Sequence, residues 1–580
     1  MRCATHVSRL VRHAGALVAM VAALLASPAS AVIPTPTVTG PIPSETPGAS
    51  PSRNYTWWAT DLVLEKYGYV EQEFFFDGLA NRYDAPNPGA FARCTAMANI
   101  VESNIPFRSR MRVIRPTDPA KFNGTVVVEW TNVTNGYDVS VWWQRPKASY
   151  LREGYAYVEV SAQNAGINGT PFGLRNWSPT RYGSLNVNAN GTVSGDALSY
   201  DIFSQAAQAV RNVPVVMGGL PVEVVIGVGE SQSASRLGTY INAIHSRDPV
   251  YDGLIASMGG ERICNNAEST KVIKLLSEQE ANNQERGTEE DTSKLRVWPV
   301  AGMSHADQQS LVSRAALFQR DQGLAAVDTC ATPARSRVLG GNMYGGAVAA
   351  MDKWLRDDTP PAIAPRFVYN DPPAGGIKRD AFGNAIGGIR TAEIEVPVAK
   401  EAGDTCGNSG THVPFSAETI NALYPTHGDY VTKVRAAALD SVVKGFVMLG
   451  DAEDQIDRAV HSIWGMQLTC GPLCADVRQF PLNPSSMLLR MQTEFFLIKG
   501  SQGTLLPLLD AATRAIAQGY TLPAGSAASK QKFAQAAELV QVYIGSVDRV
   551  LKAGLTKPET AKILIDQADT LRNLLLAQSV

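Results

Sequence analysis

Residues Val222 to His245 read VEVVIGVGESQSASRLGTYINAIH. The opening residues are mostly apolar and β-branched, which is typical of a strand covered on both faces. Gly229-Glu230-Ser231-Gln232-Ser233 follows at once, and a helical pattern begins directly behind it. A serine at the tip of such a strand-turn-helix has a strained backbone, and its hydroxyl is exposed. The stretch therefore predicts a buried parallel strand that presents Ser231 as a candidate nucleophile.

The residues around Ser231 partly fit the G-x-S-x-G pattern of such turns. Gly229 and Ser233 are both small, as the tight turn requires, although Ser233 replaces the second glycine of the pattern. The alternative interpretation is an ordinary Gly/Ser turn without chemistry. If Ser231 is the nucleophile, the helix N-terminus behind it offers free backbone amides to an oxyanion, beginning with that of Gln232.

Two further apolar runs end in the other residue types that a serine nucleophile needs. Residues 271–277 (KVIKLLS) precede Glu278-Gln279-Glu280, and residues 295–302 (LRVWPVAG) precede Met303-Ser304-His305. The carboxyl ends of parallel strands meet at one edge of a sheet, so these side chains are expected near Ser231. An imidazole takes the proton of the hydroxyl, and a carboxylate fixes the tautomer of the imidazole. The alternative for His305 alone is a surface-loop histidine.

Either glutamate fits the role of the acid. The usual strand-turn-acid pattern, placed on residues 272–280, ends on Glu280, which is slightly preferred. Glu278 remains a close rival. The partner that is not used is expected to be a solvated or supporting carboxylate.

The order serine, acid, histidine resembles that of the α/β-hydrolase superfamily. The chain is also similar to a group of large secreted bacterial proteins with an α/β-hydrolase domain. That closer likeness spans about residues 55–454 and is carried by residues 123–133 (NGTVVVEWTNV), the Ser231 turn, 277–280 (SEQE), 301–307 (AGMSHAD) and 423–425 (LYP). It implies a second oxyanion amide near Asn132 or Val133. Chemistry of this kind needs no cofactor, and no metal is expected.

The remaining pattern of the chain predicts an α/β fold, in which a mostly parallel sheet is covered by helices on both faces. Strands are expected at residues 125–130, 156–162, 222–228, 253–258, 272–277 and 296–300, and helices at 197–211, 233–246 and 345–355. This α/β-hydrolase domain is expected to span residues 54–465.

The N-terminus predicts export. Residues 1–31 carry three arginines, then an apolar run, then Ala29-Ser30-Ala31, which together indicate a secretory signal cut after Ala31. Residues 32–53 are rich in Pro, Thr and Ser and are expected to be a leader without packed structure. No later apolar run is long enough to span a membrane. The protein is expected to be secreted or periplasmic.

Six cysteines follow the predicted signal, and an oxidising compartment favours disulfides among them. They are Cys94, Cys264, Cys330, Cys406, Cys470 and Cys474. Their connectivity stays open. The paired C-x-x-C or Cys/His spacings of a zinc site are absent.

The end of the chain predicts an all-α extension over residues 480–580. Residues 530–552 have apolar residues at helical spacing, and Thr556-Lys557-Pro558-Glu559 reads as a capping box that opens a further helix to about Leu575. The two helices would form a hairpin. Packing against the hydrolase domain, oligomerisation and substrate attachment are all open roles for it.

Together these patterns favour a secreted serine hydrolase that cleaves carboxylic esters of small molecules or polymers. The net charge of −2 does not indicate nucleic-acid binding. The preference for an ester rests on analogy within the superfamily, and an amide or peptide hydrolase would use the same triad. A different alternative is a non-catalytic scaffold of the same fold whose C-terminal helices bind a partner.

Overall fold

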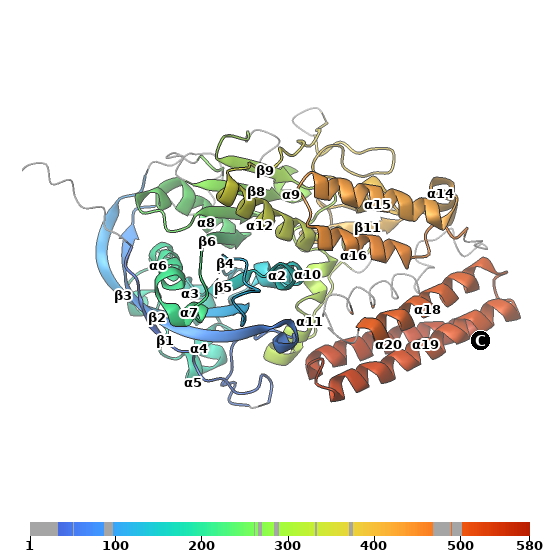
Figure 1. The fold of residues 1–580 in the computed structure, drawn as a ribbon, viewed down its shortest axis with the longest axis horizontal. Helices are drawn as coiled ribbons and strands as arrows, with labels where there is room; N and C mark the ends of the chain where they lie inside the picture. The colour runs from blue at the N-terminus through green and yellow to red at the C-terminus, as the bar shows by residue number, and fades with distance from the viewer. Residues whose placement is uncertain are drawn as a thin grey trace, which may run out of the picture.

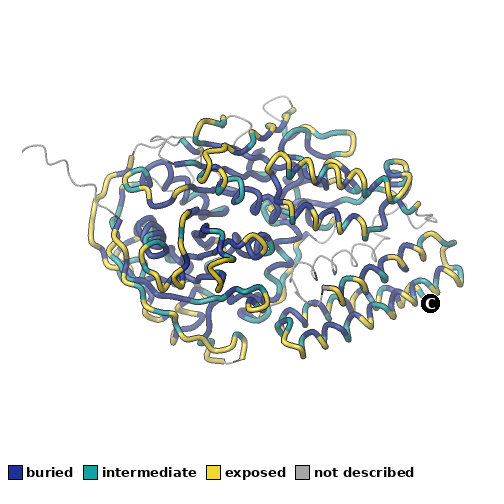
Figure 2. Tube along the Cα trace, viewed as in Figure 1, coloured by how far each residue is buried: buried dark blue, intermediate teal, exposed yellow. Residues whose placement is uncertain are grey.

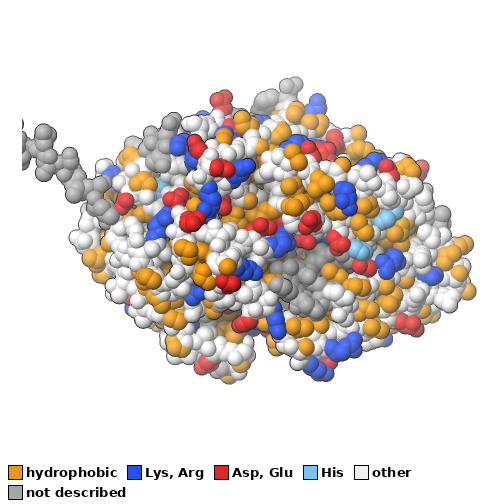
Figure 3. Space-filling model, in the orientation of Figure 1, with side chains coloured by type: hydrophobic (Ala, Val, Ile, Leu, Met, Phe, Trp, Pro, Cys, Tyr) orange, Lys and Arg blue, Asp and Glu red, His pale blue; other side chains and the backbone are white. Residues whose placement is uncertain are grey.

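The computed structural model describes residues 33–49, 51–85, 97–259, 262–264, 270–282, 289–330, 333–370, 375–467, 489, 493 and 502–580 (Figure 1). The predicted signal at 1–31 lies outside the described residues, as do Cys94, Cys470 and Cys474. Acidic and basic side chains are interspersed on the face shown in Figure 3.

A nine-stranded sheet forms the centre of the molecule, in the order β1-β2-β3-β5-β4-β6-β7-β8-β9. The strands are β1 Thr37–Thr39, β2 Tyr69–Tyr83, β3 Ile100–Pro116, β4 Thr125–Trp130, β5 Ala156–Val160, β6 Val224–Glu230, β7 Gly253–Ser257, β8 Lys271–Leu276 and β9 Leu295–Pro299. Strands β4 to β9 pair in parallel, whereas β1, β2 and β3 pair antiparallel. All six strands that the sequence predicted are present, and the mostly parallel sheet is confirmed.

The antiparallel strands β2 and β3 were not predicted, because charged side chains are buried within them. Arg110 and Arg112 of β3 are fully buried and both pair with Glu159 of β5. Arg110 also pairs with Glu73 of β2 at 2.6 Å. Buried ion pairs of this kind replace the apolar residues by which a strand is recognised in sequence.

The N-terminal leader is packed where it is described, so the prediction of an unpacked leader at 32–53 is wrong there. Strand β1 pairs with β2, with Thr37 opposite Asp77, and the side chain of Ile33 is buried. A Pro- and Thr-rich segment readily adopts extended backbone, and proline is tolerated at a sheet edge. The segment therefore closes one edge of the sheet.

Helices cover both faces of the sheet, and the predicted helices are present. The longer ones are α2 Lys147–Glu153, α6 Ser199–Asn212, α8 Gln232–Ala243, α12 Gly340–Asp357, α15 His427–Val443, α16 Leu449–Val460, α18 Gln502–Thr521, α19 Ala527–Lys552 and α20 Pro558–Ser579. Short helices include α1 Val141–Gln144, α9 Glu278–Glu280, α10 Gln308–Val312 and α11 Ala315–Leu317. Within the part of the chain that is described, no helix is both long and apolar enough to cross a membrane.

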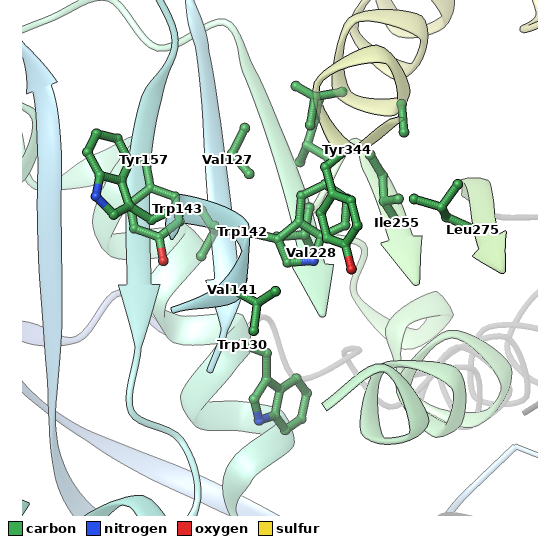
Figure 4. Packing of buried hydrophobic residues seen from close by; sticks show 14 of the residues in the cluster. Val127, Trp130, Val141, Trp142, Trp143, Tyr157, Val228, Ile255, Leu275 and Tyr344 are labelled. Carbon is green, nitrogen blue, oxygen red and sulfur yellow. The ribbon is translucent and has the colours of Figure 1, made fainter. Parts of the chain in front are cut away.

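Aromatic side chains fill the core on both sides of β4 (Figure 4). Trp130 packs against Phe203 of α6, with ring centroids 4.7 Å apart. The preceding residue, Glu129, points to the opposite face, where it accepts a hydrogen bond from the amide of Trp142 at 3.0 Å. Trp142 in turn packs against Tyr344 of α12. The carboxyl end of β4 is therefore held by closely packed aromatic side chains on both faces of the sheet.

A small second sheet accompanies the main one. It consists of β10 Ala399–Ala402 and β11 Thr411–Pro414. A disulfide joins Cys330 to Cys406 in the loop between these two strands, which confirms the expectation of disulfides for this pair.

Helices α18 to α20 form the predicted all-α extension and have a buried core of their own (Figure 2). Three helices are described there rather than the predicted hairpin of two. The predicted capping box is not formed, because α20 begins at Pro558 and the side chain of its N-cap residue, Lys557, makes no capping hydrogen bond to the described residues. The extension docks on the α/β domain through an ion pair between Glu559 and Arg320 at 2.9 Å, and Ala316 of α11 packs into the core of the extension.

Candidate active site

Ser231 lies at a sharp turn between β6 and α8. Its backbone has φ 58° and ψ −116°, a conformation that costs on the order of 1–3 kcal/mol for a residue other than glycine. The turn is held by a hydrogen bond from the Ser231 amide to the carbonyl of Ser257 in β7, at 2.9 Å. A Cβ atom on Gly229 would lie 3.0 Å from the carbonyl oxygen of Ser233, so the close approach of α8 favours glycine there. The predicted strand-turn-helix is therefore present.

Ser233, which replaces the usual glycine, forms hydrogen bonds within the turn. Its hydroxyl donates to the carbonyl of Glu230 at 2.9 Å and accepts a hydrogen bond from the Glu230 amide at 3.0 Å. A serine at this position thus closes the turn with two hydrogen bonds. The departure from G-x-S-x-G is compatible with the geometry.

His305 and Glu280 are brought together from the loops that follow β9 and β8. The Nδ1 atom of His305 lies 2.8 Å from Oε1 of Glu280. The other oxygen of Glu280 accepts a hydrogen bond from the hydroxyl of Ser277. Both glutamate oxygens are therefore engaged, and one of them fixes the orientation of the imidazole ring.

The charges around His305 favour its protonated form. Burial alone would lower the pKa of His305, but the negative charge of Glu280, and then that of Glu230, raise it above its ordinary value. Burial alone would raise the pKa of Glu280, but His305 holds it below the usual range. An imidazolium formed during a reaction would thus be stabilised where it arises.

Glu278, the rival acid, faces away from His305. One of its oxygens accepts from the amide of Gly302 at 2.6 Å, and the other accepts from the amide of Gly403 at 2.8 Å. The second oxygen also pairs with Arg379 at 2.7 Å. Glu278 therefore stabilises the turn that leads to His305 through a hydrogen bond to its backbone.

Ser231 and His305 line one cavity of about 240 Å³. Among the described residues no hydrogen bond joins the Ser231 hydroxyl to the His305 ring. The Nε2 atom of His305 lies 3.6 Å from Oε1 of Glu230. Hydrogen bonds between catalytic groups commonly tighten when substrate binds, so the shared cavity is compatible with proton transfer between them.

The predicted oxyanion donors lie beside Ser231 but are not equivalent. Gln232 is the first residue of α8, so its amide has no acceptor within the helix. The amide of Asn132 donates to the carbonyl of Val139 at 3.2 Å and is therefore not available to an oxyanion. The amide of Val133 is 3.5 Å from Oε1 of Gln232, a weak contact that leaves it as the better candidate of the loop.

The charged and polar lining residues that were not singled out from the sequence include Arg145, Glu230, Arg314 and Asn408. Glu230 stood next to Ser231 in the sequence, and its position was a usable signal. The arginines and Asn408 come from loops with no periodic pattern, so their approach depends on the tertiary fold. No group of three or more His, Cys, Asp or Glu side chains within the described ranges is arranged to hold a metal ion.

The chain belongs to the α/β-hydrolase family: the family described as "Alpha/beta hydrolase domain" matches residues 38–457. The resemblance and the fold class that the sequence implied are thereby confirmed. A search of curated proteins finds no match to this chain.

Several solved structures match part of the chain at low identity. The poly(3-hydroxybutyrate) depolymerase LpqC from Bordetella parapertussis has 13% identity and a TM-score of 0.22, covering 39% of this chain and 87% of that one. Acetyl xylan esterase 1 from Thermoanaerobacterium has 11% identity and a TM-score of 0.21, covering 36% and 68%. A bacterial brefeldin A esterase has 15% identity and a TM-score of 0.18, covering 34% of this chain and 42%, less than half, of that one.

Proposed function

We propose that this protein is a secreted serine hydrolase that cleaves carboxylic esters through an acyl-enzyme. One observation carries the proposal: Ser231, on a strained turn at the end of a parallel strand, shares a cavity with a histidine that a carboxylate orients. Strain of this kind at a serine that lines a cavity is maintained by the surrounding fold and is typical of functional positions.

In the first step the hydroxyl of Ser231 attacks the ester carbonyl. His305 accepts the hydroxyl proton at Nε2, since its Nδ1 is bonded to Glu280. The oxyanion that forms is stabilised by the amide of Gln232 and by that of Val133 from the loop after β4. Collapse of this intermediate expels the alcohol, which takes the proton from Nε2.

In the second step water hydrolyses the acyl-enzyme. His305 removes a proton from water, the hydroxide attacks the acyl carbon, and the proton returns to Ser231 as the acid leaves. Glu280 stabilises the imidazolium in both steps. Glu280 is preferred over Glu278 because it contacts His305, whereas Glu278 is committed to Arg379.

Export is part of the proposal. The predicted signal at 1–31 directs the chain out of the cytoplasm, and the disulfide between Cys330 and Cys406 is of the kind that persists in oxidising compartments.

A fluorophosphonate probe tests the proposal. The wild type should be labelled, whereas Ser231→Ala should not, because the probe reacts with an activated serine. The matched control is Ser462→Ala, which removes a serine that lies outside this cavity. Absence of labelling in both proteins would refute a Ser231 nucleophile and favour a scaffold, whereas equal labelling of Ser231→Ala would place the reactive serine elsewhere in the chain.

Turnover of matched substrates decides between ester and amide chemistry. We expect release of p-nitrophenol from short p-nitrophenyl esters and little release of p-nitroaniline from the corresponding anilides. A preference for the anilides would identify an amide hydrolase.

A further inference from the structure

Two arginines line the cavity that contains Ser231 and His305, and within the described residues neither is paired with a carboxylate. Arg145 and Arg314 have no Asp or Glu oxygen within 4.0 Å in that part of the chain, whereas the buried Arg110 and Arg112 of β3 are paired. Arg145 is buried and Arg314 is partly buried, and burial disfavours a charge that has no partner. An unpaired guanidinium in a cavity therefore points to a ligand of opposite charge.

Arg314 offers donors that the protein does not use. Its Nε donates to the carbonyl of Ser310 at 2.7 Å, and its guanidinium lies 5.9 Å from the ring centroid of Phe318. No hydrogen bond from the two terminal nitrogens to protein is found among the described residues. A guanidinium carries two terminal nitrogens in a planar fork that matches a carboxylate, so the fork of Arg314 is available to a ligand.

Arg145 is held firmly beside His305. It donates to the carbonyl of His305 at 2.5 Å, and its guanidinium lies over the ring of Tyr344 at 5.0 Å. Its Nε is buried and has no hydrogen-bond partner in the described part of the chain. The same holds for the side-chain amide of the preceding residue, Gln144, which lines the same cavity. The wall next to His305 thus contains more donors than the described protein atoms satisfy.

The residues that line the cavity carry more arginines than carboxylates, although Asp307 and Glu280, outside the lining, add negative charge near Arg145. Glu230 is the carboxylate among the lining residues, against two arginines. Asn132 donates to one Glu230 oxygen at 3.4 Å, and the other oxygen lies 3.6 Å from His305. Burial, and then the positive charge of Arg145, lower the pKa of Arg314 from its ordinary value. A bound anion would offset the mutual repulsion of the two guanidinium groups.

We propose that the ester substrates of this site carry a carboxylate group, which Arg314 binds through its terminal nitrogens while Arg145 adds positive charge beside it. The inference rests on the proposed esterase function and names its substrate class: monoesters of dicarboxylic acids and esters of similar acidic compounds. In this view Glu230 discriminates against anions placed near His305 and leaves the carboxylate to the Arg314 side.

Two matched esters test this specificity. Mono-p-nitrophenyl glutarate carries a carboxylate, and the corresponding p-nitrophenyl glutaramate replaces it with an uncharged amide of the same shape. We expect kcat/KM of the wild type to be at least ~10-fold higher for the carboxylate, as one charge-assisted pair implies. Arg314→Gln should bring the ratio of the two values close to one, and Arg314→Lys should keep part of the preference because it keeps the charge.

The control variant is Arg211→Gln, which removes an arginine of α6 that pairs with Asp252 at 2.5 Å and does not line the cavity. It should retain the wild-type ratio. Equal kcat/KM for the two esters in the wild type would overturn the carboxylate proposal while leaving esterase activity intact. An unchanged ratio in Arg314→Gln would overturn the role of Arg314.

Binding to the inactive Ser231→Ala variant separates the two proposals. Calorimetric titration should show tighter binding of the glutarate ester than of the glutaramate ester, and the difference should shrink at high salt. Equal binding would refute the carboxylate proposal even if neither ester is hydrolysed. Tighter glutarate binding without turnover by the wild type would instead support the anion site and refute the esterase function.

Discussion

Two histidine–glutamate pairs lie beside two different cavities, and they differ in instructive ways. Nδ1 of His305 is 2.8 Å from Glu280, and Nδ1 of His412 is 2.5 Å from Glu401. Burial lowers the pKa of both histidines, and the paired glutamate opposes it in each case, yet the net shift is upward for His305 and downward for His412. Glu230, a second carboxylate, raises the pKa of His305, whereas the positive charge of Arg337 lowers that of His412. A His–Glu pair by itself does not define a catalytic base.

The serines of the two cavities differ as well. The second cavity, of about 140 Å³, is lined by His412, Glu401 and Ser462, with mostly apolar side chains around them. The hydroxyl of Ser462 donates to the carbonyl of Ala459 at 2.8 Å, as serines at helix ends often do. The hydroxyl of Ser231 makes no such bond to the described residues, and its backbone is held at positive φ. A hydroxyl on a rigid turn, not committed to a helix end, distinguishes the first cavity.

The largest expected effect separates the two serines. Ser231→Ala should lower kcat for a p-nitrophenyl ester by ~10⁴-fold or more, because loss of the nucleophile removes the acyl-enzyme route. Ser462→Ala should leave kcat within about twofold of the wild type, since its hydroxyl serves a helix end. Steady-state kinetics with both purified variants measure this. Comparable losses in the two variants would erase the distinction between the cavities.

The next largest effect is expected to distinguish Glu280 from Glu401, the glutamates of the two His–Glu pairs. Glu280→Gln should lower kcat by ~10²- to 10⁴-fold, because the amide cannot stabilise the imidazolium and favours the wrong tautomer. Glu401→Gln should reduce the free energy of unfolding and leave kcat nearly unchanged. Kinetics and urea denaturation of the same preparations measure both effects. A strong loss of kcat in Glu401→Gln would show that the second pair contributes to catalysis.

A smaller effect is expected for Glu278, the rival acid. Glu278→Gln removes a charge that pairs with Arg379 and weakens two hydrogen bonds to backbone amides, which should destabilise the fold by about 1–3 kcal/mol. Its kcat should fall less than that of Glu280→Gln, because the ring of His305 keeps its partner. Urea denaturation and kinetics test this. The reverse order of the two losses in kcat would reassign the acid.

The sequence predicted the elements whose signals are local. Strands β4 to β9 are short apolar runs, and the residues after β6, β8 and β9 gave Ser231, the two glutamates and His305. Strands β2 and β3 were not predicted from the sequence, because buried charged residues, including two arginines of β3, interrupt the apolar pattern.

The choice between the glutamates and the identity of the cavity wall depended on distant residues. Glu278 is turned away by Arg379, which lies about a hundred residues further along the chain. Arg145 and Arg314 meet at the cavity from separate loops, and neither loop has a pattern that predicts this. Contacts between residues so far apart in the sequence cannot be predicted from the spacing of residues along the chain.

The raised pKa of His305 predicts the pH dependence of hydrolysis. The base must be neutral, so kcat/KM should rise with pH through a midpoint above the ordinary histidine value of about 6.5. Glu230→Gln should move this midpoint to lower pH, because it removes a negative charge that favours the imidazolium. A pH series of kcat/KM for wild type and variant measures the shift. A midpoint that stays fixed would show that Glu230 does not set the pKa of His305.

The smallest effect is expected in the second cavity, where the sign of the linkage is opposite. Burial, and then Arg337, lower the pKa of His412 against the pull of Glu401, so the folded state keeps this histidine neutral. The stability it contributes is present above the unfolded pKa of about 6.5 and is lost as pH falls toward the folded pKa. His412→Gln should therefore lose less stability than the wild type when urea denaturation is repeated from pH 7 to pH 5. If both proteins lose stability equally over that interval, His412 is not the group that responds, and the contrast between the two histidines rests on His305 alone.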